Sequence, residues 1–196
     1  YQKVSQEETQ DFVETMLADT GRLSDLIDNI LESSKSDPKS MQLQFTSVDI
    51  VSFLRDTTEH HKRLFEDKQC LIQLKFDSHP KVSLDVRAIR MVFNNLIVNA
   101  LRYSPTGSSL TIHVRKDEKF CNIDFVDQGF GFDKKELKRV FKKFYRVQNQ
   151  ETQNIEGAGL GLYISRQIVK SHKGKINAFS GGRGKGTRFM VSMPLN

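Results

Sequence analysis

The sequence predicts an α/β fold, a two-layer α/β sandwich in which a mixed sheet packs on helices, with a long helix at the N-terminus. Apolar residues recur at helical spacing through residues 1–35 and again after Asp85, and they predict two strong helices. Short segments that alternate between apolar and polar residues follow each of these helices, as half-buried strands do. Elements in such a mixed order pack as one sheet with helices on one side.

The composition is that of an ordinary globular protein, and it excludes several classes. Of the 196 residues, 37% are hydrophobic and 28% are charged, and the formal net charge is +6. No apolar run approaches the ~18 residues that a membrane-spanning helix requires, and the first ten residues are too polar for a secretory signal. Cys70 and Cys121 lack the spacing of a metal site, and they favour two thiols over a single disulfide.

Residues 1–35 form one helical pattern with a seam that requires a partner helix. The apolar positions that recur at spacings of three, four or seven are Val13, Met16, Leu23, Ile27 and Ile30. The stripe is wide enough to suit a helical bundle. Because Pro38 disfavours helix at the residue before it, we expect the helix to end there and a hinge at residues 36–42.

The middle of the chain alternates between strands and helices. Residues 43–48 and 71–76 each alternate as a strand. Asp49 lies where it can cap a helix that runs to about residue 65, and Asp85 begins a stronger helix. Pro105 and Gly107 follow the end of that helix, as turn residues do.

The last part of the chain predicts a hairpin, a helix and two further strands. Strands at 110–114 and 120–126 have hairpin spacing. A polar stretch at 147–156 precedes a helix from about Leu160 to His172. The glycine-rich residues 181–186 join strands at 175–180 and 187–193.

Asn95 and Asn99 lie four residues apart inside an apolar helix, so they share one face. Asparagine is a mediocre helix former, and an amide oxygen can bind Mg²⁺ without repelling phosphates. Arg102, one turn further on, can hold a phosphate oxygen. Taken alone, the pair is more simply explained as exposed polar residues on an amphipathic helix.

Three further clusters each allow an ordinary explanation when they are taken alone. Asp127 ends an apolar strand before Gly129 and Gly131, which let the backbone approach a flat ring, but a plain glycine turn fits equally. Residues 141–146 place Arg146 after two anchoring phenylalanines, as an amphipathic turn also does. The glycines at the start of the 160–172 helix can bind an anion through their amides, although their spacing matches neither the Rossmann motif nor the P-loop. They are Gly157, Gly159 and Gly161.

In this order and spacing, the clusters resemble the catalytic ATP-binding domain of sensor histidine kinases, a branch of the Bergerat-type ATP-binding superfamily. The segments NLIVNALRYSP, DQGFGF and FKKFYRV resemble the family's N box, first glycine box and F box. GAGLGLYISRQIVKSHKGKI and GRGKGTRF resemble its second glycine box and final glycine–threonine box. Residues 1–37 are similar to the second helix of the family's dimerisation and phosphoacceptor hairpin. The resemblance therefore implies a truncated hairpin at 1–37 and an ATP-binding domain at 43–196.

The resemblance also implies a role for each matching residue. ATP would lie between the N-box helix and a mobile lid at 147–157. Asn95 and Asn99 would hold Mg²⁺, and they would form the catalytic set together with Arg146. The residues that would contact ATP are Asn99, Arg102, Tyr103, Asp127, Gly129, Gly131, Tyr145, Arg146, Gly157, Gly159, Leu160, Gly161, Leu162 and Thr187. Among them, Asp127 would read the adenine and Thr187 would support its pocket.

The reaction that the resemblance implies is transfer of the ATP γ-phosphoryl group to a histidine, then to an aspartate of a response-regulator receiver domain. The full-length protein would form a homodimer through the helical hairpin. Its catalytic part would lie in the cytoplasm and would meet a membrane only through upstream segments. The family's acceptor histidine precedes an acidic residue, and none of the five histidines has that context. We therefore expect a fragment of a longer kinase that binds ATP without its own acceptor.

Asn95 bears on the choice between related activities. The ATP-hydrolysing branches of the superfamily resemble this segment but carry a glutamate there, and glutamate can act as a base on water whereas an amide cannot. Asn95 therefore favours a kinase over a gyrase- or chaperone-like ATPase. A non-catalytic nucleotide-binding regulatory module of the same fold stays an alternative. A basic nucleic-acid binder is a further alternative, because residues 134–143 are rich in Lys and Arg, but a solvated helix face explains them better and we expect no nucleic-acid partner.

Two positions depart from the family's pattern. Arg102 replaces a common lysine, which keeps the charge but changes the geometry of its donors. Lys173 stands where a glycine is usual, before Gly174, so we expect a strained turn there.

Overall fold

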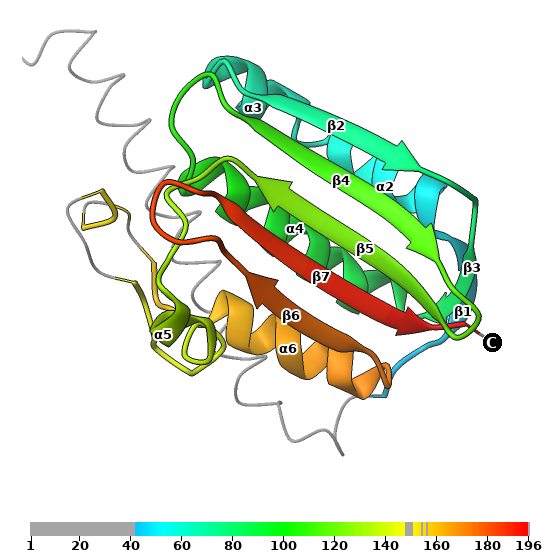
Figure 1. Ribbon diagram of the computed structural model, residues 1–196. Coiled ribbons are helices and arrows are strands. Elements are labelled where there is room, and N and C mark those ends of the chain that lie inside the picture. Colours follow the sequence, from blue (N-terminus) through cyan, green and yellow to red (C-terminus); the bar gives the residue numbers. More distant parts are fainter. Residues whose placement is uncertain (1–41, 148–150, 154, 156, 196) are drawn as a thin grey trace, which may run out of the picture.

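The computed structural model describes residues 42–147, 151–153, 155 and 157–195, and it shows a two-layer α/β sandwich (Figure 1). A five-stranded mixed sheet has the order β2–β4–β5–β7–β6. The bounds of its strands are β2 Leu71–Phe76, β4 Ser109–Lys116, β5 Phe120–Asp127, β6 Lys175–Phe179 and β7 Thr187–Pro194. β2 and β4 are parallel, and the other three neighbouring pairs are antiparallel. The predicted fold class is confirmed, whereas the helix expected at 1–37 lies outside the described residues.

The helices cover one face of the sheet and leave the other uncovered (Figure 1). The three helices of this layer are α2 Ile50–Glu59, α4 Val86–Arg102 and α6 Gly161–Ser171. Two short helices, α3 Lys62–Asp67 and α5 Lys134–Leu137, lie near the ends of the strands. At the opposite end, β1 Thr46–Asp49 pairs with β3 Lys81–Leu84 in a separate two-stranded sheet. Within the described residues, no helix is both long and apolar enough to cross a membrane.

The core lies between the sheet and the helical layer, and aromatic rings join the two. The ring of Phe93 on α4 packs 5.6 Å from that of Phe53 on α2 and 5.5 Å from that of Phe125 on β5. All three side chains are buried. Offset and tilted aromatic pairs of this kind add stability beyond the area that they bury. α4 is therefore packed against both α2 and the sheet, and this packing fixes the position of its polar face.

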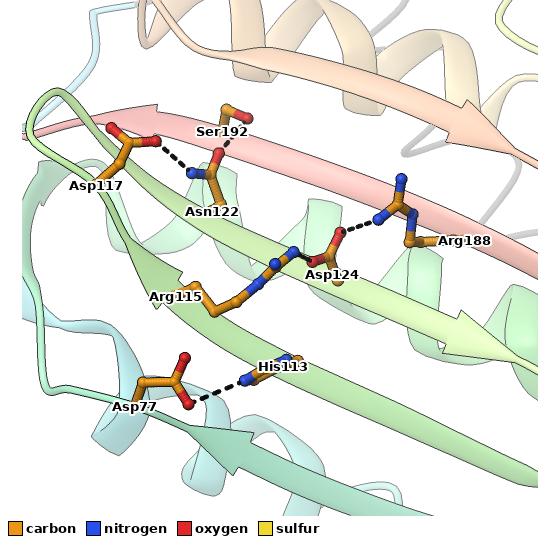
Figure 2. Close-up of polar contacts among 8 residues, drawn as sticks. All are labelled: Asp77, His113, Arg115, Asp117, Asn122, Asp124, Arg188 and Ser192. Carbon is orange, nitrogen blue, oxygen red and sulfur yellow. Dashed lines mark hydrogen bonds and ion pairs between the residues drawn. The ribbon is translucent and has the colours of Figure 1, made fainter.

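The uncovered face of the sheet is polar, and Figure 2 shows how its charges are paired. Asp124 on β5 is buried there because Arg115 on β4 and Arg188 on β7 extend over it from both sides, and both form ion pairs with it. His113 on β4 contacts Asp77 at 3.2 Å. A buried carboxylate requires such partners, because an unpaired charge out of water is costly. The two arginines therefore compensate the buried charge of Asp124 on this face.

Both expected helix starts are confirmed, but the first helix is shorter than expected. The Asp49 and Asp85 carboxylates accept hydrogen bonds from backbone N–H groups three residues later, as N-caps do. The expected helix to residue 65 was wrong, because the chain turns at His60 and His61 between α2 and α3. Each of these two imidazoles contacts the backbone carbonyl four residues earlier through Nδ1. Those carbonyls would accept the next N–H groups of a continuous helix, so the side chains compete with its extension.

Other boundaries also differ from the sequence prediction. The first strand begins at Thr46 rather than at residue 43, and α5 covers only the start of the helix face expected at 134–143. β3 had no predicted counterpart, because four residues are too few for a clear periodic pattern. The hairpin β4–β5 is confirmed, and the last two predicted strands pair as the hairpin β6–β7. Lys173 adopts φ +59°, the left-handed backbone expected where a glycine is usual.

Candidate functional site

Two asparagines of α4 meet the first turns of α6 on the helical side of the sheet. Asn95 donates from Nδ2 to the Ser165 hydroxyl of α6 at 3.0 Å, and Asn99 donates from Nδ2 to Asn95 Oδ1 at 3.4 Å. Because both amide nitrogens are engaged, the orientation of each amide is fixed by its partners. The Asn99 Oδ1 atom has no hydrogen bond within the described residues, so it is the amide oxygen left available for a ligand.

The close approach of α6 to these amides depends on a glycine. A Cβ atom added to Gly161, the first residue of α6, would lie only 2.3 Å from Asn95 Oδ1. Such a distance forces the neighbour to move, so no other residue fits there without displacing Asn95. α6 therefore begins beside the two asparagines, and the backbone N–H groups of its first turn, which lack helical acceptors, would stabilise an anion at that end.

A buried carboxylate lies at the end of β5. Asp127 is 8% exposed, and its Oδ1 accepts hydrogen bonds from the backbone N–H of Gly129 at 2.8 Å and of Thr187 at 2.9 Å. Burial raises the pKa of this carboxyl to about 6, although both N–H donors act in the opposite direction. The second oxygen, Oδ2, has no hydrogen bond among the described residues. An acceptor held in this way can receive a hydrogen bond from a ligand amino group.

The glycine loop after Asp127 is packed against the end of α4. The Phe130 N–H donates to the Tyr103 carbonyl at 2.8 Å, and a Cβ on Gly129 would lie 2.4 Å from that same oxygen. On its other side the loop meets the β6–β7 connection, where the Gly186 N–H donates to the Gly129 carbonyl at 3.0 Å. Gly131 has φ +59°, and a Cβ on it would lie only 2.4 Å from the Gly182 carbonyl oxygen, so no side chain fits there. Three separate segments thus enclose Asp127.

The order of these parts along the chain matches a known family. The family described as histidine kinase-, DNA gyrase B-, and HSP90-like ATPase matches residues 84–196, more than half of the chain. The chain belongs to this family. Its match begins at the end of β3 and includes every site residue described above. Membership assigns ATP binding to this domain, and the predicted family is confirmed.

Individual relatives of this ATPase domain are sensor kinases by name. The sensor histidine kinase WalK of Bacillus subtilis is 35% identical over 178 residues, which cover 90% of this chain and 29% of WalK. Among solved structures, full-length ShkA in complex with AMPPNP has a TM-score of 0.82 at 21% identity, with 99% of this chain and 40% of that chain covered. The histidine kinase ThkA in complex with the response regulator protein TrrA has a TM-score of 0.77 at 20% identity, with 98% and 53% covered. The chain thus spans less than a third of the length of WalK.

In this ATPase domain, the segment after α5 lies against the start of the second glycine box. Gly159 has φ +69°, and a Cβ on it would lie 2.8 Å from the backbone of Phe144. Arg146 donates from Nη2 to the Ile155 carbonyl, and its buried Nε has no partner among the described residues. The Arg139 guanidinium lies 4.5 Å from the centre of the Tyr145 ring. Arg146 therefore retains a donor that a bound ligand would satisfy.

The structure brings some predicted site residues together and leaves others apart. Asn95, Asn99 and Gly161 form one centre, and Tyr103, Asp127, Gly129, Gly131 and Thr187 form the second, at the C-terminal end of α4. Leu160 is buried as the residue before α6, and Leu162 is half-buried. Arg102 and Gly157 are exposed, and no contact within the described residues draws either into the two centres.

Sequence reasoning missed three residues of this ATP-binding domain. Ser165 fixes the Asn95 amide, and a serine on the buried face of a predicted helix was the available signal. Ser104 is buried with a hydroxyl that has no hydrogen-bond partner among the described residues, beside the Gly129 loop. Gly186 has φ +66° and its would-be Cβ lies 2.2 Å from the Asp127 carbonyl oxygen. No single-sequence pattern places Gly186 beside Asp127, because 59 residues separate them.

Proposed function

We propose that this chain is the ATP-binding catalytic part of a sensor histidine kinase, which transfers the γ-phosphoryl group of ATP to a histidine on an acceptor helix. Membership of the ATPase family and the names of the relatives support ATP and this acceptor class. The observation that carries the proposal is the state of Asn95. It is a neutral amide anchored to Ser165 at 3.0 Å, so it cannot take a proton from water as a carboxylate could.

Asp127 is proposed to select the adenine base. Its Oδ1 atom is committed to two backbone N–H groups, so Oδ2 is the acceptor available to the adenine amino group. The glycines around it allow the α4 end and the β6–β7 connection to pack closely against the loop that carries this carboxylate. Thr187 supports this arrangement through its backbone N–H, and Tyr103 through its contact with the Gly129 loop. A buried acceptor discriminates strongly, since a base that cannot donate would leave it unpaired.

The two asparagines fit a magnesium ion that accompanies ATP. Among the described residues, no three His, Cys, Asp or Glu side chains gather as a metal site, so a cation here would need other oxygen ligands. Amide oxygens are suitable hard ligands, and Mg²⁺ keeps several waters and binds substrate phosphates. Asn99 would hold the ion through its available Oδ1, and Asn95 would orient Asn99. When bound, the ion would neutralise charge on the phosphates during transfer.

The phosphate groups are proposed to lie between the N-terminus of α6 and the cationic side chains of this region. Gly161 and the residue before it leave backbone N–H groups without helical acceptors, which favours an anion. Arg146 has an unsatisfied Nε, and Arg102 lies in the last turn of α4. Tyr145, Gly157, Gly159, Leu160 and Leu162 are proposed to shape this end of the site. In the transfer itself, a histidine nitrogen bonds to the γ-phosphorus, the bond to the bridging oxygen breaks, and ADP leaves.

The histidine-phosphorylated partner would pass its phosphoryl group to an aspartate of a response-regulator receiver domain. ThkA, whose fold is shared, is a histidine kinase seen with a response regulator protein. The full-length protein is proposed to be a homodimer through the helical hairpin to which residues 1–37 would belong.

The proposal is tested by supplying the acceptor in trans. The chain is mixed with Mg²⁺, [γ-³²P]ATP and a separate helical-hairpin protein that carries the family's histidine–acidic motif. We expect acid-labile label on the acceptor, a loss of at least tenfold in rate for Asn99→Ala, and no change for Asn122→Ala. Asn122 is a matched control because it lies on the uncovered face of the sheet, bonded to Ser192. Steady phosphate release without labelled histidine would instead identify a hydrolase, and ATP binding without either product would identify a non-catalytic module.

A further inference from the structure

A lysine outside the matched family region reaches the end of the helix that carries the site. Lys68 follows α3, and its ammonium Nζ donates to the Leu101 carbonyl at 2.6 Å and to the Ser104 carbonyl at 2.7 Å. These acceptors lie 33 and 36 residues further along the chain. The distance of 2.7 Å is at the short end of the range for charge-assisted hydrogen bonds, and that of 2.6 Å is slightly below it. The side chain is half-buried, so solvent screens these contacts less than it would at the surface.

The Lys68 ammonium lies at the C-terminal end of α4, where a cation stabilises a helix most. The last carbonyls of α4 have no helical donors, and they carry the negative end of the helix dipole. Arg102, the basic residue in the last turn of α4, is exposed and donates to none of these carbonyls within the described residues. Lys68 therefore supplies from another element the cation that terminates α4.

The carbonyls held by Lys68 flank the contact between α4 and the Asp127 loop. Tyr103 lies between them, and its own carbonyl accepts the Phe130 N–H at 2.8 Å. Ser104 and Tyr103 both lie against Gly129, whose N–H is bonded to Asp127. A shift of the last turn of α4 would therefore move the loop that presents the Asp127 carboxylate.

A second set of bonds joins the residues that follow Lys68 to the connection after α4. The Leu71 N–H donates to the Ser108 carbonyl at 3.0 Å, and the Ser108 hydroxyl donates to the Pro105 carbonyl at 2.7 Å. The thiol of Cys70 lies 3.5 Å from the Ser108 hydroxyl. Residues 68–71 thus contact both the end of α4 and the turn that leads into β4. These bonds restrain the backbone from which the Lys68 side chain extends.

We propose that Lys68 is a positioning residue for the nucleotide base: its ammonium holds the end of α4 so that the Asp127 loop stays in its binding geometry. The inference rests on the proposed function, because it assumes that Asp127 binds adenine. Among the described residues, the hydrogen bonds of the Lys68 ammonium go to the carbonyls of Leu101 and Ser104, so Lys68 would act on the site through these carbonyls. Its loss should therefore weaken nucleotide binding without slowing the transfer step of the bound complex.

The test compares Lys68→Met with Lys62→Met in the same helix region. Lys62 has a 61% exposed side chain and a single surface ion pair with Glu59 at 3.8 Å, so it is a matched control. We expect the Kd for ATP to rise about tenfold in Lys68→Met, corresponding to ~1.4 kcal/mol. The transfer rate at saturating ATP should stay at the wild-type value, and Lys62→Met should change neither quantity. Lys68→Arg, which restores the charge, should recover part of the affinity.

The outcomes separate this inference from the proposed function. Wild-type affinity in Lys68→Met, or an equal loss in the rate at saturating ATP, would overturn the positioning role. A wild-type chain that does not bind ATP would overturn the proposed function instead. A lower unfolding temperature with unchanged affinity would show a purely structural role and would also overturn the inference. If Lys68→Met does not fold, Lys68→Gln removes the same charge with a polar head and gives the same comparison.

Discussion

At the residue scale, the site is built around one carboxylate that is costly to bury. Asp127 has a pKa raised to about 6, and its largest cause is removal from water. One pKa unit corresponds to ~1.4 kcal/mol, so ionisation of this group in the folded state costs about 3 kcal/mol relative to an ordinary aspartate. Because the folded pKa lies above the ordinary value of 3.8, the free energy of unfolding is highest below about pH 4, where the carboxyl is protonated in both states. This stability is lost as the pH rises through about 6.

We predict that Asp127→Asn separates binding from stability. The amide oxygen can still accept the N–H groups of Gly129 and Thr187, but the charge and the second acceptor are gone. The free energy of unfolding should rise by about 2 kcal/mol at pH 7, while the affinity for ATP falls at least tenfold, as expected for a hydrogen bond to a charged group. Urea unfolding and ATP titration measure the two effects.

The pH dependence provides the control for this variant. At pH 4 the wild-type carboxyl is protonated in the folded state, so the stability difference between the two proteins should disappear. The wild-type affinity for ATP should fall as the pH is lowered through about 6, and that of Asp127→Asn should not show this step. Equal ATP affinity in both proteins at pH 7 would remove the adenine assignment.

Lys173 carries a different cost, which is a strained backbone conformation. Its φ of +59° lies in the left-handed region that glycine occupies freely, and the next residue, Gly174, is packed against the Ser192 carbonyl. Lys173 is exposed, so its side chain itself meets no steric obstacle. The sequence pattern was sufficient to predict this strain because it is a local property of the backbone.

At the element scale, the decisive feature is the crossing of α4 and α6. The helices approach closely because α6 begins with Gly161, which has no Cβ. The Asn95 amide occupies the space that a Cβ would need. α4 also carries the Tyr103 contact with the Asp127 loop at its end. One helix therefore sets the distance between the two centres of the site.

We predict that Gly161→Ala disrupts the site although alanine favours helices. A helix gains up to ~1 kcal/mol when alanine replaces glycine, but the new Cβ would lie 2.3 Å from Asn95 Oδ1. Phosphoryl transfer should fall at least tenfold through displacement of Asn95 and Asn99, while the helical circular dichroism is retained. Gly181→Ala is the control, because its Cβ would meet only the flexible Lys185 side chain at 3.3 Å. Full activity in Gly161→Ala would show that the orientation of Asn95 does not matter.

At the scale of the whole molecule, the site joins elements from both ends of the domain. α4, α6, β5, β7 and the β6–β7 connection each contribute, and the uncovered face of the sheet contributes none of the residues of the two centres. A ligand that bridges these elements binds only the folded state. Binding should therefore stabilise the entire domain by mass action.

We predict that Mg-ATP raises the unfolding temperature of the chain. At one hundred times Kd, the gain in the free energy of unfolding is ~2.7 kcal/mol, or about 5 °C or more for a domain of this size. EDTA should reduce the shift, because the asparagines would hold the ion that pairs with the phosphates. GTP serves as the control for base selection by Asp127, and it should give a much smaller shift. An equal shift with GTP would contradict that selection.

The fold class, both helix caps and the family could be predicted from the sequence. These depend on local periodicity, on capping residues such as Asp85, and on motifs that stand within short segments. β3 and the break at His60 could not be predicted, because each depends on contacts that a periodic pattern does not contain.

The assembly of the site, in contrast, depends on contacts between distant segments. The bond from Asn95 to Ser165, the approach of Gly186 to Asp127 and the reach of Lys68 to Ser104 each join segments 36 to 70 residues apart. The physical reason is that such contacts are fixed by the packing of helices on the sheet, which sets distances and burial. A side chain's neighbours in sequence determine its local conformation, whereas its pKa and its free hydrogen-bonding atoms depend on what the fold brings next to it.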